Sequence, residues 1–182
     1  MILMKKLVTL TIFIFALVFT TTTSAQKFSG LDKSPMDMAA YPTDYKVSEK
    51  AVRISYGRPQ LKGRSLSELA PVGQVWRTGA NEAAEITFYN DVNFGGKDIT
   101  AGTYSLFTIP GEAEWTVILN KNLNQWGSYF YEEGADVARV TVPSASDSTS
   151  LEEFSIAFKE VDNGVHMVMG WDKTRVAVPI TM

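Results

Sequence analysis

The stretch FSIAFKEVDNGVHMVMGW (154–171) shows most directly how this chain folds. Apolar and polar residues alternate from 154 to 159 and again from 165 to 171, which is the period of a strand with one buried face. Between the two runs stands Asp162-Asn163-Gly164, a set of residue types that favours tight reversals. The stretch therefore predicts two antiparallel strands joined by a short turn.

The same alternation recurs along most of the chain after residue 50. Further runs cover residues 52–56, 84–88, 104–109, 115–119 and 176–180. Gly95-Gly96 predicts another hairpin, because both central residues of a type I′ turn need a positive φ. We predict an all-β fold, an antiparallel β-sandwich of the Greek-key or jelly-roll kind, as a single domain over residues 51–182.

The sequence pattern also predicts how individual segments of the chain are folded. The run 104–109 is apolar on both faces, so we expect this strand to be covered on both sides. The polar stretch SASDSTS (144–150) predicts a loop, and residues 65–69 predict one short helix. Residues 26–50 lack hydrophobic periodicity and predict an extended N-terminal segment with little regular structure.

Residues 1–25 have the layout of a secretory signal peptide. Lys5 and Lys6 precede an apolar run at 7–19, and Ser24-Ala25 supplies small residues before a cut at Gln26. No later stretch is long and apolar enough to span a membrane, and no cysteine is present to carry a bacterial lipid anchor. We expect a soluble protein, periplasmic or secreted, with no membrane association once the signal is removed.

Charge and residue counts exclude several classes of function. The chain has 17 Lys+Arg and 20 Asp+Glu, a net charge of −3, which becomes −5 once Lys5 and Lys6 are removed with the signal. Nucleic-acid binding normally needs a basic surface, so we expect no nucleic-acid partner. No cysteine and a single histidine exclude disulfides, thiol nucleophiles and the common zinc motifs, so we expect no metal and no cofactor.

The segment YGRPQLKGRSLSELAPVGQVWRTGANEAA (56–84) interrupts the alternation and predicts a long structured loop, a kind of segment that often carries function. Four of the six arginines, Arg53, Arg58, Arg64 and Arg77, lie within residues 53–77, together with Lys62. These guanidinium groups suit a carboxylate, a phosphate or an acidic sugar. The alternative is that they fix the loop by pairing with Glu68, Glu82, Glu85 or backbone carbonyls.

A second candidate segment is NQWGSYFY (124–131), where aromatic residues stand beside amides. Such a set suits the apolar face and hydroxylated rim of a sugar ring, although aromatic residues also close the ends of sandwiches. The predicted ligand-binding residues are Tyr56, Arg58, Trp76, Arg77, Asn81, Glu82, Trp126 and Tyr129.

Glu82 is the one candidate for a catalytic acid or base. A glycosidase needs a second carboxylate within about 10 Å, and Asp98 and Asp172 are candidates that the spacing does not select between. The alternative is a structural ion pair.

Several motifs resemble an uncharacterised family of exported proteins common in Bacteroidota, known as a domain of unknown function. The most specific is VWRTGANEA (75–83), and the resemblance extends over residues 50–182 through segments such as AGTYSLFTIP (101–110), QWGSYFY (125–131) and VAVPI (176–180). The resemblance implies a secreted, mostly β domain and supplies no catalytic residues. It also implies that the loop at 75–83 is the signature of the family.

These observations lead to three hypotheses. The first is a non-catalytic binding domain for a small polar or anionic molecule, with a saccharide as one candidate. The second is a hydrolase that uses Glu82, and the third is a structural envelope protein, which predicts an exposed apolar patch. The sequence identifies no protein partner.

Overall fold

The computed structural model describes residues 26–182, so the predicted signal peptide (1–25) lies outside the described residues. The chain divides into two units, Met1–Leu31 and Asp32–Met182. Residues 26–31 form no helix or strand and are exposed. The strands of the described residues all belong to the second unit.

The regular secondary structure of the second unit is almost entirely strands, with one short α-helix and one 3₁₀ turn among the described residues. In chain order the elements are β1 (Met36–Tyr41), β2 (Val52–Gly57), α2 (Leu66–Leu69), β3 (Ala84–Phe88), β4 (Val92–Phe94), β5 (Lys97–Ile99), β6 (Gly102–Ile109), β7 (Glu114–Asn120), η1 (Glu133–Ala135), β8 (Asp136–Val161) and β9 (Gly164–Thr181). The predicted all-β class is confirmed, and α2 forms within the predicted residues 65–69.

All strand pairs are antiparallel, and they form one continuous sheet in the order β1-β2-β3-β6-β7-β8-β9-β4-β5. The two predicted hairpins are present: Val161 pairs with Gly164 across one turn, and Phe94 pairs with Lys97 across the other. Gly95 and Gly96 have φ values of 56° and 89°, as a type I′ turn requires.

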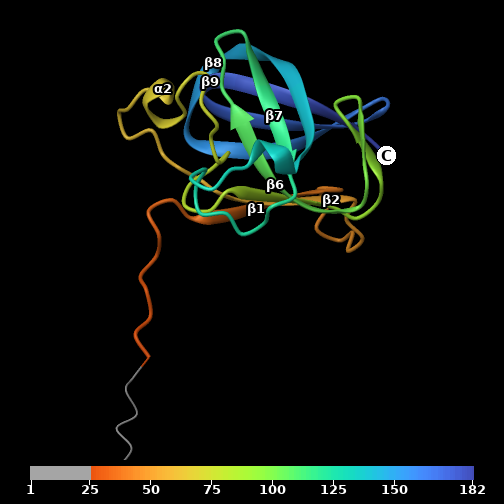
Figure 1. The fold of residues 1–182 in the computed structure, drawn as a ribbon, viewed down its shortest axis with the longest axis horizontal. Coiled ribbons are helices and arrows are strands. Elements are labelled where there is room, and N and C mark those ends of the chain that lie inside the picture. The colour runs from red at the N-terminus through yellow and green to blue at the C-terminus, as the bar shows by residue number, and fades with distance from the viewer. Residues whose placement is uncertain (1–25) are drawn as a thin grey trace, which may run out of the picture. The chain divides into compact units, whose positions relative to one another are not determined.

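The long strand β8 lets the single sheet fold over on itself. Its first part, from Asp136 to Pro143, pairs with β7, and its remainder, from Ser144 onward, pairs with β9. Strands that change partner in this way form the corners of folded sheets. The hydrogen bonding therefore gives one bent sheet in place of the two separate sheets expected of a sandwich; Figure 1 shows blue β8 and β9 arching above orange β1 and β2.

Residues just after β2 contact β8, although β2 and β8 are not neighbours in the sheet. Gln60 forms an isolated antiparallel bridge with Glu153. The Leu61 amide donates to the Glu152 carbonyl, and the Phe154 amide donates to the Pro59 carbonyl, both at 3.0 Å. The bent sheet thus encloses its own core.

The prediction of a loop at 144–150 is wrong, because these polar residues lie within β8. Ser144 and Ser146 pair with β9, and the register then shifts between Ser146 and Leu151. The Arg175 side chain fixes this irregular part, since its Nη2 donates to the Thr149 carbonyl at 2.6 Å. Polar composition marked exposure correctly here but did not mark the end of the strand.

The strand β1 is an element that the sequence pattern did not predict. It lies inside the predicted N-terminal segment (26–50) and pairs with β2 from Met36↔Gly57 to Tyr41↔Val52. As the edge strand it buries little, with Met36 and Met38 exposed, so it lacks the alternation that marks the other strands.

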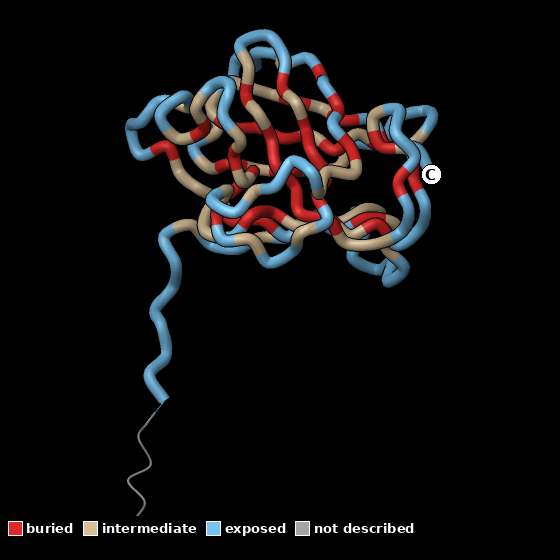
Figure 2. Tube along the Cα trace, in the orientation of Figure 1, coloured by how far each residue is buried: buried red, intermediate tan, exposed pale blue. Residues whose placement is uncertain are grey.

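Two hydrophobic clusters cover the two faces of the central strands. The larger one fills the interior of the bent sheet and includes residues from every strand except β1. The smaller one, on the outer face, consists of Ala83, Phe107 and Ile118, with Tyr131 packed against them. Residues Tyr104 to Thr108 of β6 are all buried, which confirms that this strand is covered on both sides. Figure 2 shows buried residues along the strands and exposed ones in the loops.

Candidate functional site

The structure divides the eight predicted binding residues into two groups. Tyr56, Arg58 and Trp76 are built into the interior or tied to β8. Arg77, Asn81, Glu82, Trp126 and Tyr129 come together where the loop after Trp76 meets the loop after β7. We refer to these last five residues as the aromatic surface.

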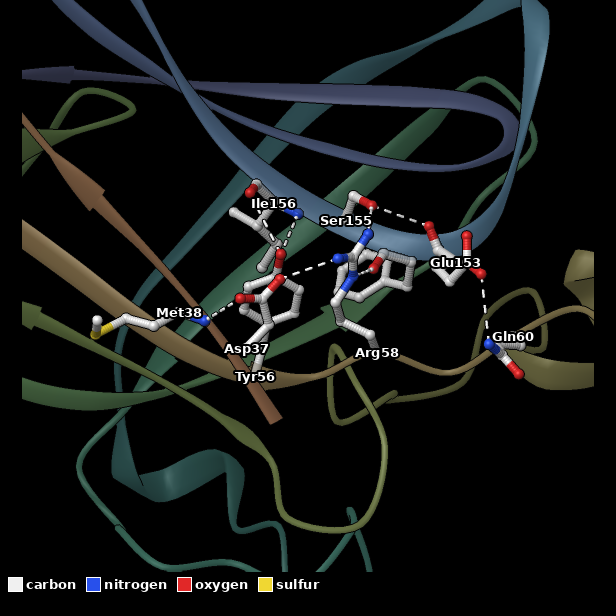
Figure 3. Close-up of polar contacts among 9 residues, drawn as sticks. Asp37, Met38, Tyr56, Arg58, Gln60, Glu153, Ser155 and Ile156 are labelled. Atoms are coloured by element: carbon white, nitrogen blue, oxygen red, sulfur yellow. Dashed lines mark hydrogen bonds and ion pairs between the residues drawn. The ribbon is translucent and has the colours of Figure 1, made fainter. Parts of the chain in front are cut away.

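The Arg58 side chain links the end of β2 to β1 and β8. Its Nη1 contacts the Asp37 carboxylate in β1 at 3.0 Å, its Nη2 donates to Ser155 Oγ at 2.7 Å, and its Nε donates to the Phe154 carbonyl at 3.1 Å. Figure 3 shows the side chain reaching from the end of β2 toward Asp37 and Ser155. All three guanidinium nitrogens are thus engaged by the protein itself. The bond to a backbone carbonyl agrees with the structural alternative, whereas Asp37 and Ser155 are not among the partners that it named.

Tyr56 makes a similar link one step further inside. Its hydroxyl accepts a hydrogen bond from the Ile156 amide at 3.0 Å and donates to the Ile156 carbonyl at 3.4 Å (Figure 3). Its ring packs edge-on against Phe154, with 5.7 Å between centroids. Burial raises the pKa of the Tyr56 hydroxyl. The side chain is buried and its hydroxyl is satisfied, so it belongs to the core.

Trp76 is the centre of the aromatic core. It stacks on Trp171 with 5.5 Å between centroids and packs edge-on against Trp115 and Phe154. Its backbone exchanges two hydrogen bonds with Thr108 of β6, at 2.7 and 2.9 Å. Only 5% of the residue is exposed, so Trp76 anchors the loop at 75–83 in the core.

The residues after Trp76 turn tightly and press their backbone against β2. Thr78 and Asn81 have positive φ values of 52° and 63°, which non-glycine residues seldom adopt. A Cβ added to Gly57 would come within 2.4 Å of the Ala80 carbonyl oxygen, and one added to Gly79 would come within 3.1 Å of the Gly57 carbonyl oxygen. Gly57 thus permits a backbone contact that a side chain would prevent, and Gly79 keeps the same contact free of crowding.

This turn carries Glu82 to a position directly opposite Trp126. The Ala83 amide donates to the Gln125 carbonyl at 2.8 Å, and the Gly127 amide donates to the Asn81 carbonyl at 2.9 Å. Those two bonds flank the isolated bridge between Glu82 and Trp126. The pair is therefore of the non-hydrogen-bonded kind, in which the two side chains lie on the same face and close together.

Arg77 and Tyr129 complete the aromatic surface around Gly127. A Cβ added at position 127 would lie 2.8 Å from the Tyr129 ring and 3.2 Å from Arg77 Nη1, so both side chains rest on this glycine. Within residues 26–182, the one hydrogen bond from the Arg77 side chain goes to the Asn81 carbonyl at 3.3 Å. Trp126 is 54% exposed and Tyr129 is 76% exposed.

The other cations of the predicted cluster do not converge on this surface. Arg64 donates to the Leu61 and Gln60 carbonyls of its own loop. Arg53 lines a separate surface cavity of about 370 Å³ together with Lys50 and Tyr89. The cationic stretch at 53–77 is therefore spread over several parts of the fold.

One family comparison assigns the chain. A family model described as a protein of unknown function (DUF2911) matches residues 34–180. The chain belongs to this family. The match covers nearly the whole sheet, the residues Tyr56 and Arg58, and the aromatic surface. No curated protein and no solved structure matches the chain significantly. No helix of the described residues is long and apolar enough to cross a membrane.

Sequence reasoning missed several members of this part of the DUF2911 fold. Phe130 is 70% exposed beside Tyr129. Gln125 has a buried side-chain oxygen without a hydrogen-bond partner among the described residues, and the Glu85 carboxylate accepts from the Asn124 amide at 2.7 Å. The dense aromatic composition of 124–131 was the signal for Phe130. Nothing local signals a partner 39 residues away, such as Glu85.

The aromatic surface places exposed aromatic rings beside a carboxylate and a guanidinium group. The Glu82 carboxylate is exposed, and no described side chain donates a hydrogen bond to it. Asp98 lies in β5 and Asp172 in β9, on elements other than those that carry Glu82. Within residues 26–182, no three His, Asp or Glu side chains are grouped as ligands of a metal ion would be.

Proposed function

We propose that this DUF2911 domain is a non-catalytic binding domain and that its ligand is a saccharide held on the aromatic surface. The observation that carries the proposal is the opposed pair of Glu82 and Trp126, which places a free carboxylate beside an exposed indole ring. Arg77 and Tyr129 extend the same arrangement, a cation and a second aromatic ring next to the first pair.

This combination suits a pyranose ring. One face of the ring presents C–H groups that pack on an aromatic side chain, and its rim presents hydroxyl groups. A carboxylate accepts hydrogen bonds from hydroxyl protons, and a guanidinium donates to hydroxyl oxygens. Glu82 and Arg77 therefore supply both halves of the hydrogen bonding that a sugar rim offers.

The charges favour a neutral saccharide over a strongly anionic one. Glu82 offsets the charge of Arg77 within the aromatic surface, and the whole chain carries a net charge of −3. A polyanionic ligand would gain little long-range attraction from such a protein. A neutral polyhydroxyl ligand does not depend on such long-range attraction.

Backbone strain supports a functional role for the turn. Thr78 is β-branched and buried yet has a φ of 52°, and Asn81 has a φ of 63°. Such conformations cost about 1–3 kcal/mol each and gather at ligand-binding segments. Here they bring Glu82 to its place opposite Trp126.

Trp126 provides a direct assay. The chain has four tryptophans, and Trp76, Trp115 and Trp171 are all at most 5% exposed, so Trp126 alone is in contact with solvent. Titration of the purified protein with neutral oligosaccharides and with uronic-acid oligosaccharides should shift or quench the emission of Trp126. We expect the neutral series to act at lower concentration.

Three variants test the assignment. Trp126→Ala and Glu82→Gln should abolish or weaken binding measured by calorimetry, while the fold remains intact by circular dichroism. Tyr89→Ala removes another exposed aromatic residue, directly after β3, and should bind as the wild type does. Equal binding by all three variants, or no response to any saccharide, contradicts the proposal.

We also infer that the domain acts outside the cytoplasm. The support is the pattern of residues 1–25, with Lys5 and Lys6 before an apolar run and Ser24-Ala25 at its end. Mass spectrometry of the protein recovered from cell fractions should find an N-terminus at Gln26 in the exported fraction. A full-length chain in the cytoplasm contradicts this inference.

A further inference from the structure

The loop that carries Trp126 and Tyr129 is held in place by a polar network at its base. The loop joins β7 to β8, and the Lys121 amide donates to the Ala135 carbonyl at 2.9 Å, which closes its two ends. Within the loop, Trp126, Tyr129 and Phe130 are exposed. A loop whose large side chains face solvent draws little stability from its own burial, so its position depends on hydrogen bonds, both those to residues 81–85 and those at its base.

Asp136 is the centre of that network. Its side chain is 7% exposed. One carboxylate oxygen accepts from the Tyr131 hydroxyl at 2.6 Å and from Arg139 Nη1 at 2.7 Å, and the other accepts from Asn120 Nδ2 at 2.8 Å. The Arg139 nitrogen also donates to the Tyr131 hydroxyl at 2.8 Å. A nearly buried carboxylate is thus fully hydrogen-bonded and paired with a cation.

The three donors come from three different parts of the chain. Asn120 is the last residue of β7 and is itself 1% exposed; its Nδ2 also donates to the Glu132 carbonyl at 2.9 Å. Arg139 lies in β8, three residues after Asp136. Tyr131 belongs to the loop itself, five residues after Trp126. The carboxylate therefore ties the loop to both strands that it connects.

Tyr131 also joins the network to the turn on the other side of the aromatic surface. Its ring packs edge-on against Phe107, with 5.0 Å between centroids. Phe107 shares the smaller hydrophobic cluster with Ala83, the residue next to Glu82. The segments that carry Glu82 and Trp126 thus rest on one cluster, and Tyr131, which packs against that cluster, is held by Asp136.

From this geometry we infer that Asp136 and Tyr131 are positioning residues, which hold the loop so that Trp126 stays opposite Glu82. Neither residue needs to touch a ligand. The inference relies on the proposed saccharide site only for its effect on affinity. Its effect on the order of the loop is independent of any ligand.

The first test removes the hydroxyl and keeps the ring. Tyr131→Phe deletes one donor to Asp136 and leaves the contact with Phe107. We expect amide hydrogen exchange within residues 121–131 to accelerate roughly tenfold, which corresponds to the loss of one hydrogen bond to a charged group. Acrylamide should quench the emission of Trp126 more strongly, and the affinity for a neutral oligosaccharide should fall by a similar factor.

The matched control is Tyr41→Phe, which also removes a tyrosine hydroxyl bonded to a carboxylate. The Tyr41 hydroxyl donates to Glu160 at 3.0 Å. Tyr41 lies in β1 and Glu160 in β8, so both residues are outside the loop. This variant should leave exchange at 121–131, the quenching of Trp126 and the affinity unchanged. Asp136→Asn should reproduce the effects of Tyr131→Phe, because an amide replaces the acceptor that the Tyr131 hydroxyl and Arg139 share.

The outcomes separate the two proposals. Faster exchange at 121–131 together with stronger quenching of Trp126 supports the positioning role, even when no saccharide binds and the proposed function fails. Unchanged exchange and quenching in Tyr131→Phe overturn the positioning role, even when saccharide binding is confirmed. Exchange that accelerates evenly through the whole sheet also overturns it, because that result assigns Tyr131 to general stability.

Discussion

Trp76 and Trp126 are the same residue type in two segments singled out by the sequence, and the fold gives them opposite environments. Trp76 lies 5% exposed among Trp115, Phe154 and Trp171, whereas Trp126 is 54% exposed beside Glu82. Arg58 and Arg77 differ in a similar way: Arg58 uses all three guanidinium nitrogens within the protein, and Arg77 makes one weak bond among the described residues. The segment 75–83 thus combines one residue anchored in the core with residues that belong to the exposed aromatic surface.

Of the changes considered, Trp76→Ala should have the largest effect on stability. Removing a fully packed indole leaves a cavity between three aromatic side chains, so the free energy of unfolding should fall by about 3–5 kcal/mol. Urea denaturation followed by circular dichroism measures this loss. A loss below about 1 kcal/mol would mean that Trp76 is not the anchor of the core.

Arg58→Ala should have the next largest effect. The change leaves Asp37 without its cation and removes the donors to the Phe154 carbonyl and Ser155, at a cost of about 1–3 kcal/mol because charged hydrogen bonds are lost. Arg77→Ala, the matched change on the aromatic surface, should cost less than half as much and should weaken saccharide binding instead. Equal losses of stability would remove the distinction between the two arginines.

Gly127→Ala tests how tightly the aromatic surface is packed. The φ of 69° and the nearby Tyr129 ring both oppose a Cβ, and we expect a loss of about 1–2 kcal/mol with a changed Trp126 emission. Gly96→Ala is the control, because φ is 89° there but no atom lies within 4 Å of the added Cβ. The cost at Gly127 beyond that at Gly96 measures the contact with Tyr129 and Arg77.

Alkaline pH should loosen the base of the loop. Burial, and then the hydrogen bond to Asp136, raise the pKa of the Tyr131 hydroxyl above its ordinary value. The stability gained from the protonated hydroxyl is therefore complete below the unfolded pKa of about 10 and is lost as the pH rises toward the folded value. Between pH 9 and pH 11, urea denaturation should show a steeper loss for the wild type than for Tyr131→Phe. Identical slopes for the two proteins contradict the assignment.

Trp126→Ala should have the smallest effect on stability. An exposed side chain away from the core contributes within about 0.5 kcal/mol, so the urea midpoint should hardly move. Binding of neutral oligosaccharides should nevertheless be lost. A large loss of stability would place Trp126 with Trp76, and the contrast between the two tryptophans would disappear.

The sequence predicted those features that depend on near neighbours. Alternation at 154–159 and 165–171 predicted two strands correctly, and Gly95-Gly96 predicted its hairpin, because a strand face and a turn are each decided within a few residues. Where local signals were weak or misleading, the prediction failed. The edge strand β1 buries little, and the polar residues 144–150 continue β8 because Arg175 and β9 hold them there.

The candidate site was predicted as a set of residues but not as an arrangement. Aromatic and amide composition at 124–131 singled out this segment but left open whether its side chains are exposed; Trp126, Tyr129 and Phe130 are exposed. It did not show that Glu82 would lie opposite Trp126, since that pairing joins segments 44 residues apart. The ion pair between Arg58 and Asp37 is likewise formed only when β1 and β2 lie side by side.

By itself, the sequence determined the all-β class, the antiparallel hairpins and the exclusion of thiol and disulfide chemistry, because these follow from local periodicity, turn residues and counts. Only the tertiary structure decided that β8 bends to close one sheet around the core. It also decided that Trp76 is buried while Trp126 is exposed. The reason is that exposure depends on which distant segment packs against each residue, and residue type alone does not encode that partner.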